Sequence, residues 1–254
     1  MSVLDLFKLD GNVAIVTGAG RGIGKVLAIA YAEAGASVVA ADLDGQTARQ
    51  TADEIRKMGR KALAVQVDVV SKADVQAMVK AAVDEFGKLD ILLNNAGICR
   101  HAAAEEMSEP DWDEVVAIDL KGVFLCSQAA ARVMIPRRYG RIVNIASMSG
   151  SVVNRPQEQC SYNAAKAGVI QLTRSLAAEW AEFGIAVNCI SPGYTATEMT
   201  KRVSHMHPHW LPHIPMGRLG EPEELRGAAI YLASKAASYT TGLDLVVDGG
   251  YSCW

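Results

Sequence analysis

The chain has 254 residues, half of them apolar, and a formal net charge of −3. That balance gives no electrostatic reason to expect nucleic acid or an anionic membrane as a partner, and no apolar run is long enough to span a bilayer. The first residues lack the basic-then-apolar pattern of a secretion signal, and the five scattered cysteines contain no Cys-x-x-Cys pair. We therefore expect a cytoplasmic protein with reduced thiols.

Short apolar runs alternate with amphipathic stretches along the chain. Strands are predicted at residues 12–17, 37–42, 62–67, 89–93, 140–146, 185–190 and 244–247. Helices are predicted between them, the first ending near residue 33 and the others at residues 46–58, 72–86, 111–137, 162–183 and 222–233. Because apolar strands alternate with helices, we expect one α/β domain over residues 1–254, a doubly wound Rossmann fold with a seven-stranded parallel sheet. Residues 198–216 break the alternation and contain three prolines, which predicts a lid over the substrate.

A glycine-rich loop follows the first predicted strand. Gly18, Gly22 and Gly24 stand in the spacing Thr-Gly-x-x-x-Gly-x-Gly, with Arg21 and Ile23 between them. Glycines let backbone amides approach a pyrophosphate, whose negative charge the N-terminus of the following helix favours. The loop therefore predicts a dinucleotide site.

Asp42 ends the second predicted strand, with Leu43 directly after it. An acid at this place accepts hydrogen bonds from the adenosine ribose and repels a 2′-phosphate, so it favours NAD over NADP. Arg21 in the glycine loop favours NADP. We give Asp42 more weight because its charge opposes the phosphate directly.

Tyr162 and Lys166 stand four residues apart in a predicted helix, so their side chains share one face. A nearby cation favours the phenolate, and we expect it to lower the tyrosine pKa from its usual value of ~10 toward the working range. A phenol placed in this way can act as a general base. Ser147 follows the fifth predicted strand, at the edge where such folds bind ligands, and its hydroxyl can hold a substrate oxygen beside Tyr162.

Taken in order, these segments resemble the short-chain dehydrogenase/reductase family, from about Leu9 to the C-terminus. The motifs that carry the resemblance are Thr17 to Gly24, Asn94-Asn95-Ala96-Gly97, Ser147, Tyr162 with Lys166, and Pro192-Gly193. The resemblance implies a nicotinamide-dependent oxidoreductase that acts on CH–OH groups. It gives Tyr162 the proton transfer, Ser147 the substrate oxygen, and Lys166 a second task as a partner of the nicotinamide ribose.

The resemblance also extends the cofactor site. It implies cofactor contacts at three further segments. Asp68 and Val69 would meet the adenine, and the backbone of Asn95, Ala96 and Gly97 would lie close to the passing cofactor. The nicotinamide carboxamide would meet the loop that contains Pro192, Gly193, Thr195 and Thr197.

One position departs from the family pattern, because Asp119 stands where the long helix normally carries a catalytic asparagine. An aspartate can order the same water that leads to the lysine, but it adds a charge near Lys166. That charge should stabilise the ammonium and partly offset its effect on Tyr162. The alternative is a near-isostere without an electrostatic role.

Polar residues between Ser147 and Tyr162 point to a hydroxylated substrate. The candidate substrate ligands are Ser147, Ser149, Asn154, Gln157 and Tyr162. Here the chain is similar to bacterial polyol dehydrogenases of the galactitol type, which implies interconversion of a polyol or sugar and its ketone. The alternatives are a reductase of keto-gluconate or 3-oxoacyl groups, and a weakly catalytic NAD-binding sensor or scaffold.

We expect no metal site and a homotetramer. Four histidines lie in the predicted lid, at positions 205, 207, 209 and 213, but no nearby acid or cysteine completes a ligand set. The helices predicted at residues 111–137 and 162–183 carry apolar residues over more than one face. In the family these helices pack across a two-fold axis, and closed symmetry is the usual outcome.

Overall fold

The centre of the computed structural model, which describes residues 2–201 and 203–253, is a sheet of seven parallel strands. The strands are β1 (Val13–Thr17), β2 (Ser37–Asp42), β3 (Ala62–Gln66), β4 (Ile91–Asn94), β5 (Gly140–Ile145), β6 (Ile185–Pro192) and β7 (Asp244–Val247). Their order across the sheet is β3-β2-β1-β4-β5-β6-β7, and every neighbouring pair is parallel. The predicted single α/β domain with a seven-stranded parallel sheet is confirmed.

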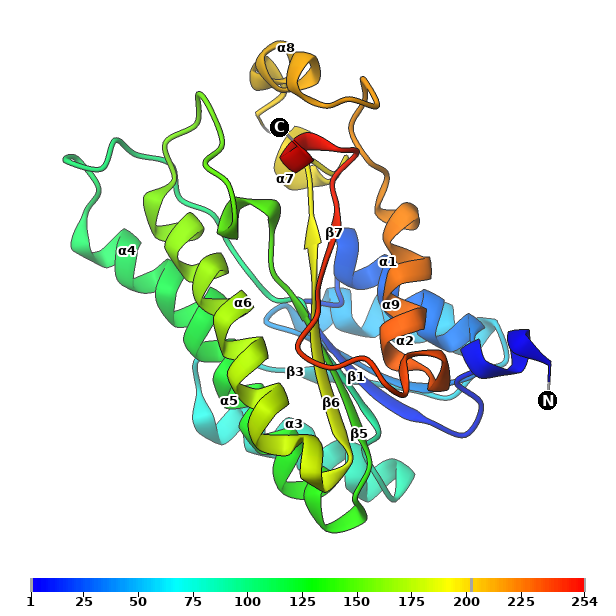
Figure 1. The fold of residues 1–254 in the computed structure, drawn as a ribbon. Coiled ribbons are helices and arrows are strands. Elements are labelled where there is room, and N and C mark those ends of the chain that lie inside the picture. The colour runs from blue at the N-terminus through cyan, green and yellow to red at the C-terminus, as the bar shows by residue number, and fades with distance from the viewer. Residues whose placement is uncertain (1, 202, 254) are drawn as a thin grey trace.

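Helices cover both faces of the sheet (Figure 1). One layer contains α1 (Gly22–Glu33), α2 (Gly45–Lys57) and α9 (Arg226–Ala233), and the other contains α3 (Lys72–Phe86), α5 (Gly122–Met134) and α6 (Cys160–Trp180). Strand β1 packs against both layers, since Ala14 and Val16 belong to the first core cluster and Ile15 to the second. A strand buried on both faces is a continuous apolar run, which is the pattern that predicted it.

Local signals set several helix ends. The residues directly before α2, α3 and α4 (Glu109–Val116) are N-caps. They are Asp44, Ser71 and Ser108, and each side chain accepts a hydrogen bond from a backbone amide in the first turn. Such caps satisfy amides that have no partner inside the helix. Gly87 ends α3 with a φ of +78°, a conformation that favours glycine.

The helix predicted over residues 111–137 is not regular throughout. Helix α4 ends at Val116, a π-helical turn covers Ala117–Lys121, and α5 follows directly. Asp119 lies in this turn and is fully buried. Such turns are frequent at functional sites, but the apolar pattern continues through this one, so no local signal predicted it.

The carboxyl ends of the strands meet at one edge of the sheet. Two short helices, α7 (Glu198–Lys201) and α8 (His207–Trp210), lie beyond this edge (Figure 1) and belong to the segment predicted as a lid. Strand order reverses between β1 and β4, where sheets of this type bind ligands. In the described part of the chain, no helix has the length and apolar character needed to cross a membrane.

Candidate active site

The loop after β1 has the backbone of a phosphate-binding turn. Gly18 and Gly22 have φ angles of +63° and +54°, which favour glycine. Gly24 is needed for another reason, because a Cβ there would lie 2.1 Å from the carbonyl oxygen of Gly18 and 2.3 Å from Asn95 Nδ2. The loop leads into the first turn of α1, whose amides have no partner inside the helix. This backbone fits the pyrophosphate of a dinucleotide.

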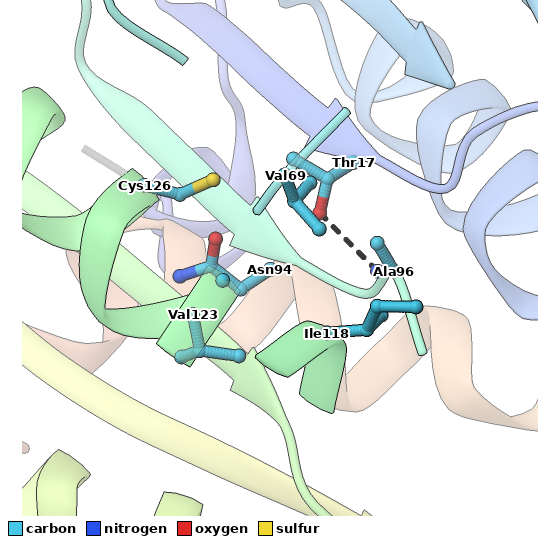
Figure 2. Close-up of a pocket in the computed structure, with 8 residues that line it drawn as sticks. Thr17, Val69, Asn94, Ala96, Ile118, Val123 and Cys126 are labelled. Carbon is cyan, nitrogen blue, oxygen red and sulfur yellow. Dashed lines mark hydrogen bonds between the residues drawn. The ribbon is translucent and has the colours of Figure 1, made fainter. Parts of the chain in front are cut away.

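Asn95 and Thr17 hold the glycine loop in place. Asn95 Nδ2 donates hydrogen bonds to the carbonyl oxygens of Thr17 and Gly18, both at 3.1 Å. The Thr17 hydroxyl accepts from the amides of Asn95 at 3.0 Å and Ala96 at 3.2 Å, and Figure 2 shows the second of these bonds. The Asn-Asn-Ala-Gly segment and the glycine loop, far apart in the sequence, are therefore one structural unit.

A small hollow lies behind this unit, between β4 and α5 (Figure 2). Its lining is mostly apolar and includes Val69, Val123 and Cys126. Asn94 also lines it, but its Nδ2 donates to Ser127 Oγ at 3.0 Å and Asn144 Oδ1 at 2.8 Å, which are contacts of the protein interior. The hollow is too small for a substrate and belongs to the packing of the sheet.

Asp42 lies against the glycine loop. Its side chain is 8% exposed, Oδ2 accepts from the amide of Gly20 at 2.8 Å, and Oδ1 accepts from the amide of Asp44 at 3.0 Å. Gly20 has no room for a side chain, since a Cβ there would lie 2.2 Å from Thr47 Oγ1. Sequence reasoning missed Gly20, although its place between Gly18 and Gly22 was a signal. Arg21, the predicted counterweight to Asp42, is exposed.

An open groove of about 480 Å³ adjoins the predicted adenine contacts. Leu43 and Asp68 border it, together with side chains of β3 and α3. Leu43 is 66% exposed, whereas Val69 is 8% exposed and Ile23 is partly buried. A large apolar residue left this exposed beside a groove is suited to cover a flat ring.

The loop after β6 folds back onto the glycine loop. Thr195 is 6% exposed, and its hydroxyl donates to the carbonyl of Gly193 at 3.1 Å. The hydroxyl of Thr200 accepts from the amide of Thr197 at 2.9 Å and fixes the turn. The methyl carbon of Thr197 lies 3.7 Å from the Cβ position of Gly22. The predicted carboxamide and pyrophosphate segments are therefore adjacent.

Helix α6 places Lys166 beside Tyr162, as their spacing predicts. Lys166 Nζ lies 5.5 Å from the centroid of the Tyr162 ring, and it donates a hydrogen bond to the carbonyl of Ile145 at 3.0 Å. The lysine is 3% exposed, whereas Tyr162 is only partly buried. The phenol can therefore meet a ligand while the ammonium stays away from bulk water.

Ser147 follows β5 and completes the set. It is 7% exposed, and its hydroxyl accepts from the amide of Ser149 at 3.1 Å; it also lies close enough to Tyr162 to lower the pKa of the phenol. Gly150 allows this turn to approach α6, because a Cβ there would lie 2.7 Å from the carbonyl carbon of Lys166. The structure thus brings Ser147, Tyr162 and Lys166 together at the carboxyl edge of the sheet.

Asp119 forms an ion pair with Lys166. Its Oδ2 lies 3.2 Å from Lys166 Nζ, and its Oδ1 accepts from the amide of Ile98 at 2.8 Å. The side chains of both members of the pair are almost completely buried, 0% exposed for the acid and 4% for the lysine. Gly97 makes room for the carboxylate, since a Cβ there would lie 2.9 Å from Oδ2. The charge predicted near Lys166 is therefore in direct contact with it.

Burial and charge set the protonation of these groups. Burial raises the pKa of Tyr162, and Asp119 adds to this, so the lowering by Lys166 and by the Ser147 hydroxyl is outweighed. Lys166 lowers the pKa of Tyr162 as predicted, but desolvation of the phenolate is the larger effect, so the net direction in the protein alone is upward and not toward the working range. Burial lowers the pKa of Lys166, but Asp119 and Tyr162 raise it by more, and the net direction is upward. Burial likewise raises the pKa of Asp119 against the pull of Lys166.

Two of the predicted substrate ligands contact other parts of the protein. Asn154 is 1% exposed, and its Nδ2 donates to the hydroxyl of Tyr194 at 3.1 Å. Gln157 Oε1 accepts from the Tyr194 hydroxyl at 2.8 Å and from Trp210 Nε1 at 2.7 Å. These amides hold Tyr194 and the helix α8, and direct contact of either one with a substrate stays a prediction.

Sequence reasoning missed Gln159, a buried residue that contacts Ser149, which is another of the predicted substrate ligands. Its Nε2 donates to Asn163 Oδ1 at 2.9 Å and to Ser149 Oγ at 3.4 Å, and its Oε1 accepts from the Cys99 thiol at 3.7 Å. Gln159 and Ser149 are 5% and 6% exposed. The polar run before Tyr162 was the only available signal, and it did not single out one glutamine.

The lid histidines do not gather into a metal site. Within residues 2–201 and 203–253, no group of three or more His, Cys, Asp or Glu side chains is placed to hold a metal ion. His207 instead lies with Nε2 3.2 Å from the carbonyl oxygen of Thr200.

Comparisons with known proteins agree with this geometry. The family model described as enoyl-(acyl carrier protein) reductase matches residues 18–252. The chain is 44% identical to the galactitol 2-dehydrogenase (L-tagatose-forming) of Cereibacter sphaeroides, over 100% of both chains. It is 43% identical to the NADP-dependent mannitol dehydrogenase of Hypocrea jecorina, over 98% of this chain and 96% of that protein. The crystal structure of a short-chain type dehydrogenase/reductase from Mycobacterium marinum covers 100% of both chains, with a TM-score of 0.98 and 45% identity. The chain therefore belongs to the short-chain dehydrogenase/reductase family, and its alcohol dehydrogenase relatives make it an oxidoreductase of the type that acts on CH–OH groups.

Proposed function

We propose that the protein interconverts a secondary alcohol of a polyol or sugar and the corresponding ketone, with NAD as its cofactor. The observation that carries the proposal is the set of Ser147, Tyr162 and Lys166 at the carboxyl edge, beside a glycine loop that fits a dinucleotide. The nicotinamide, when bound, supplies the hydride acceptor or donor. The protein's own residues hold the substrate oxygen and transfer its proton.

Tyr162 takes the alcohol proton during oxidation and returns it during reduction. Ser147, whose hydroxyl lies near the phenol, holds the substrate oxygen beside it. Lys166 favours the phenolate and is itself kept charged by Asp119. Because oxidation requires the phenolate and burial raises the tyrosine pKa, the oxidation rate should increase toward basic pH.

The substrate class rests on the relatives and on the polar character of the site. Two full-length relatives are named for galactitol and mannitol. We infer that residues 198–216 form a lid that covers a substrate bound near Ser147 and Tyr162. Reduction of NAD should be measured across a panel of polyols, with a 3-oxoacyl thioester and a keto-gluconate assayed in the reverse direction. Turnover of the oxoacyl substrate alone would contradict the polyol assignment.

The choice of NAD rests on Asp42. Its carboxylate is fixed by the amides of Gly20 and Asp44 beside the glycine loop, where a 2′-phosphate would meet a like charge. The exposed Arg21 and the NADP dependence of the mannitol dehydrogenase relative favour the other cofactor. We give Asp42 more weight because its position is held by two hydrogen bonds.

We further propose a homotetramer. Trp112 on α4 and Phe124 on α5 are 39% and 38% exposed, and a subunit interface would cover such large apolar side chains. Light scattering should give about four times the mass of one chain, and a monomer would contradict the proposal.

A further inference from the structure

The side-chain carbonyl of Gln157 accepts hydrogen bonds from two aromatic residues of other segments. The Tyr194 hydroxyl donates at 2.8 Å and Trp210 Nε1 donates at 2.7 Å. A carbonyl oxygen has two lone pairs, so these two donors use its capacity. The side-chain carbonyl of Gln157 is therefore fully engaged by the protein itself.

The two aromatic donors form one packed unit. The rings of Tyr194 and Trp210 stack with centroids 4.0 Å apart and an interplanar angle of 8°, and Tyr251 meets Tyr194 edge-on at 5.4 Å. Tyr194 is 8% exposed and Trp210 is 2% exposed. Burying an indole N–H to this degree costs free energy when no acceptor is present, which destabilises the docked position. Docking of Trp210 therefore depends on the carbonyl of Gln157.

This contact joins three segments around the candidate active site. Gln157 precedes Tyr162 in the chain, Tyr194 lies in the loop after β6, and Trp210 ends α8 in the lid segment (Figure 1). Asn154 adds a second hydrogen bond to the Tyr194 hydroxyl, at 3.1 Å. The lid is thus held by side chains of the same segment that leads into the catalytic helix.

We propose that Gln157 is a positioning residue, which holds residues 198–216 over the substrate by accepting the hydrogen bond of the Trp210 indole. Substrate affinity then depends on docking of the lid and not on contact between Gln157 and the substrate. The kinetic part of this inference rests on the proposed dehydrogenase function, whereas the docking itself does not.

Gln157→Leu and Gln157→Glu test the acceptor. Leucine has no acceptor atom, whereas glutamate keeps an acceptor oxygen at the same reach. Gln157→Leu removes the acceptor of both donors, but the Tyr194 hydroxyl keeps its hydrogen bond with Asn154. We therefore expect KM for the best polyol to rise about five- to tenfold, the scale of the lost Trp210 hydrogen bond. We expect a smaller change in kcat, NAD affinity within a few-fold, and Gln157→Glu close to the wild type. An unchanged KM in Gln157→Leu would overturn the proposal.

Trp210→Phe tests the donor, because phenylalanine keeps a ring for the Tyr194 stack and removes the N–H. It should raise KM to a similar degree. The double variant with Gln157→Leu should be no worse than Gln157→Leu alone, since both changes remove one and the same hydrogen bond. Fully additive effects would mean that the two side chains act separately, against the proposal.

Limited digestion with trypsin under native conditions measures docking of the lid when no substrate is present. Lys201 lies in the lid segment with an exposed side chain, and cleavage after it should be faster in Gln157→Leu and Trp210→Phe than in the wild type. Tyr31→Phe is the matched control, because it removes a buried hydrogen bond to the carbonyl of Ala229, far from the lid in the α1–α9 layer. Equal acceleration in the control would assign the effect to general destabilisation and overturn the proposal. If the wild type oxidises no polyol, the proposed function fails, while the digestion still decides whether Gln157 docks the lid.

Discussion

Two regions border the carboxyl edge of the sheet and are built from different contacts. The proposed cofactor side contains the glycine loop (residues 18–24), and the proposed lid side contains residues 198–216. On the cofactor side, the backbone carbonyl of Gly18 accepts a hydrogen bond from Asn95, and the close packing of Gly24 leaves no space for a methyl group. On the lid side, the α8 segment is held by the Gln157 carbonyl and an aromatic stack. Close backbone packing has few alternative arrangements, whereas side-chain contacts can break and re-form. We therefore expect a rigid cofactor site and a lid that opens for substrate exchange.

The largest effect should come from Tyr162, the proposed proton carrier. Tyr162→Phe keeps the ring and removes the proton carrier, so kcat should fall by at least about 100-fold, within the range for general acid–base groups. NAD affinity, measured by fluorescence titration, should stay within a few-fold because the glycine loop is untouched. A rate above about one hundredth of the wild type would remove Tyr162 from the proposed role.

The rigidity of the cofactor side can be tested with two glycines in helices. In Gly24→Ala the new methyl group collides with the carbonyl of Gly18, and we expect a loss of about 1–3 kcal/mol in unfolding free energy together with weaker NAD binding. Gly227→Ala in α9 is the control, because a Cβ there has no neighbour within 4 Å. It should be neutral or stabilising by up to about 1 kcal/mol. Similar melting temperatures for both variants would contradict the rigid description.

Asp42 tests the charge of the cofactor side. The wild type should show a higher kcat/KM with NAD than with NADP, and Asp42→Ala should reduce that ratio about tenfold by removing a like charge and a ribose partner. Steady-state kinetics with both cofactors provides the measurement. If the wild type prefers NADP, Arg21 outweighs Asp42.

The smallest expected effect is the electrostatic contribution of Asp119. Because Asp119 raises the pKa of Tyr162, Asp119→Asn should lower it and move the rise of the oxidation pH–rate profile to lower pH. NAD affinity should not change. A large loss of rate without a shift would instead show that Asp119 orders the proton relay, and an unchanged profile would make it a near-isostere of asparagine.

The local sequence determined much of the fold, and within the candidate site it determined the glycine loop and the pairing of Tyr162 with Lys166. Strand β1 was predictable because a strand buried on both faces is apolar at every position, and Tyr162 and Lys166 because residues four apart share a helix face. The glycine loop was predictable because a sharp turn at a phosphate needs glycines at fixed spacing. Each of these depends on residues that are neighbours in the chain.

Only the tertiary structure decided the partners of Gln157 and the protonation of Tyr162. Gln157 meets donors 37 and 53 residues away, and a glutamine that faces a substrate has the same local sequence as one that holds a tryptophan. The net pKa shift of Tyr162 is a balance of burial against the charges of Lys166 and Asp119, and burial outweighs the lysine. Both depend on which distant segments pack together, because hydrogen-bond pairing and desolvation are set by three-dimensional neighbours and not by position along the chain.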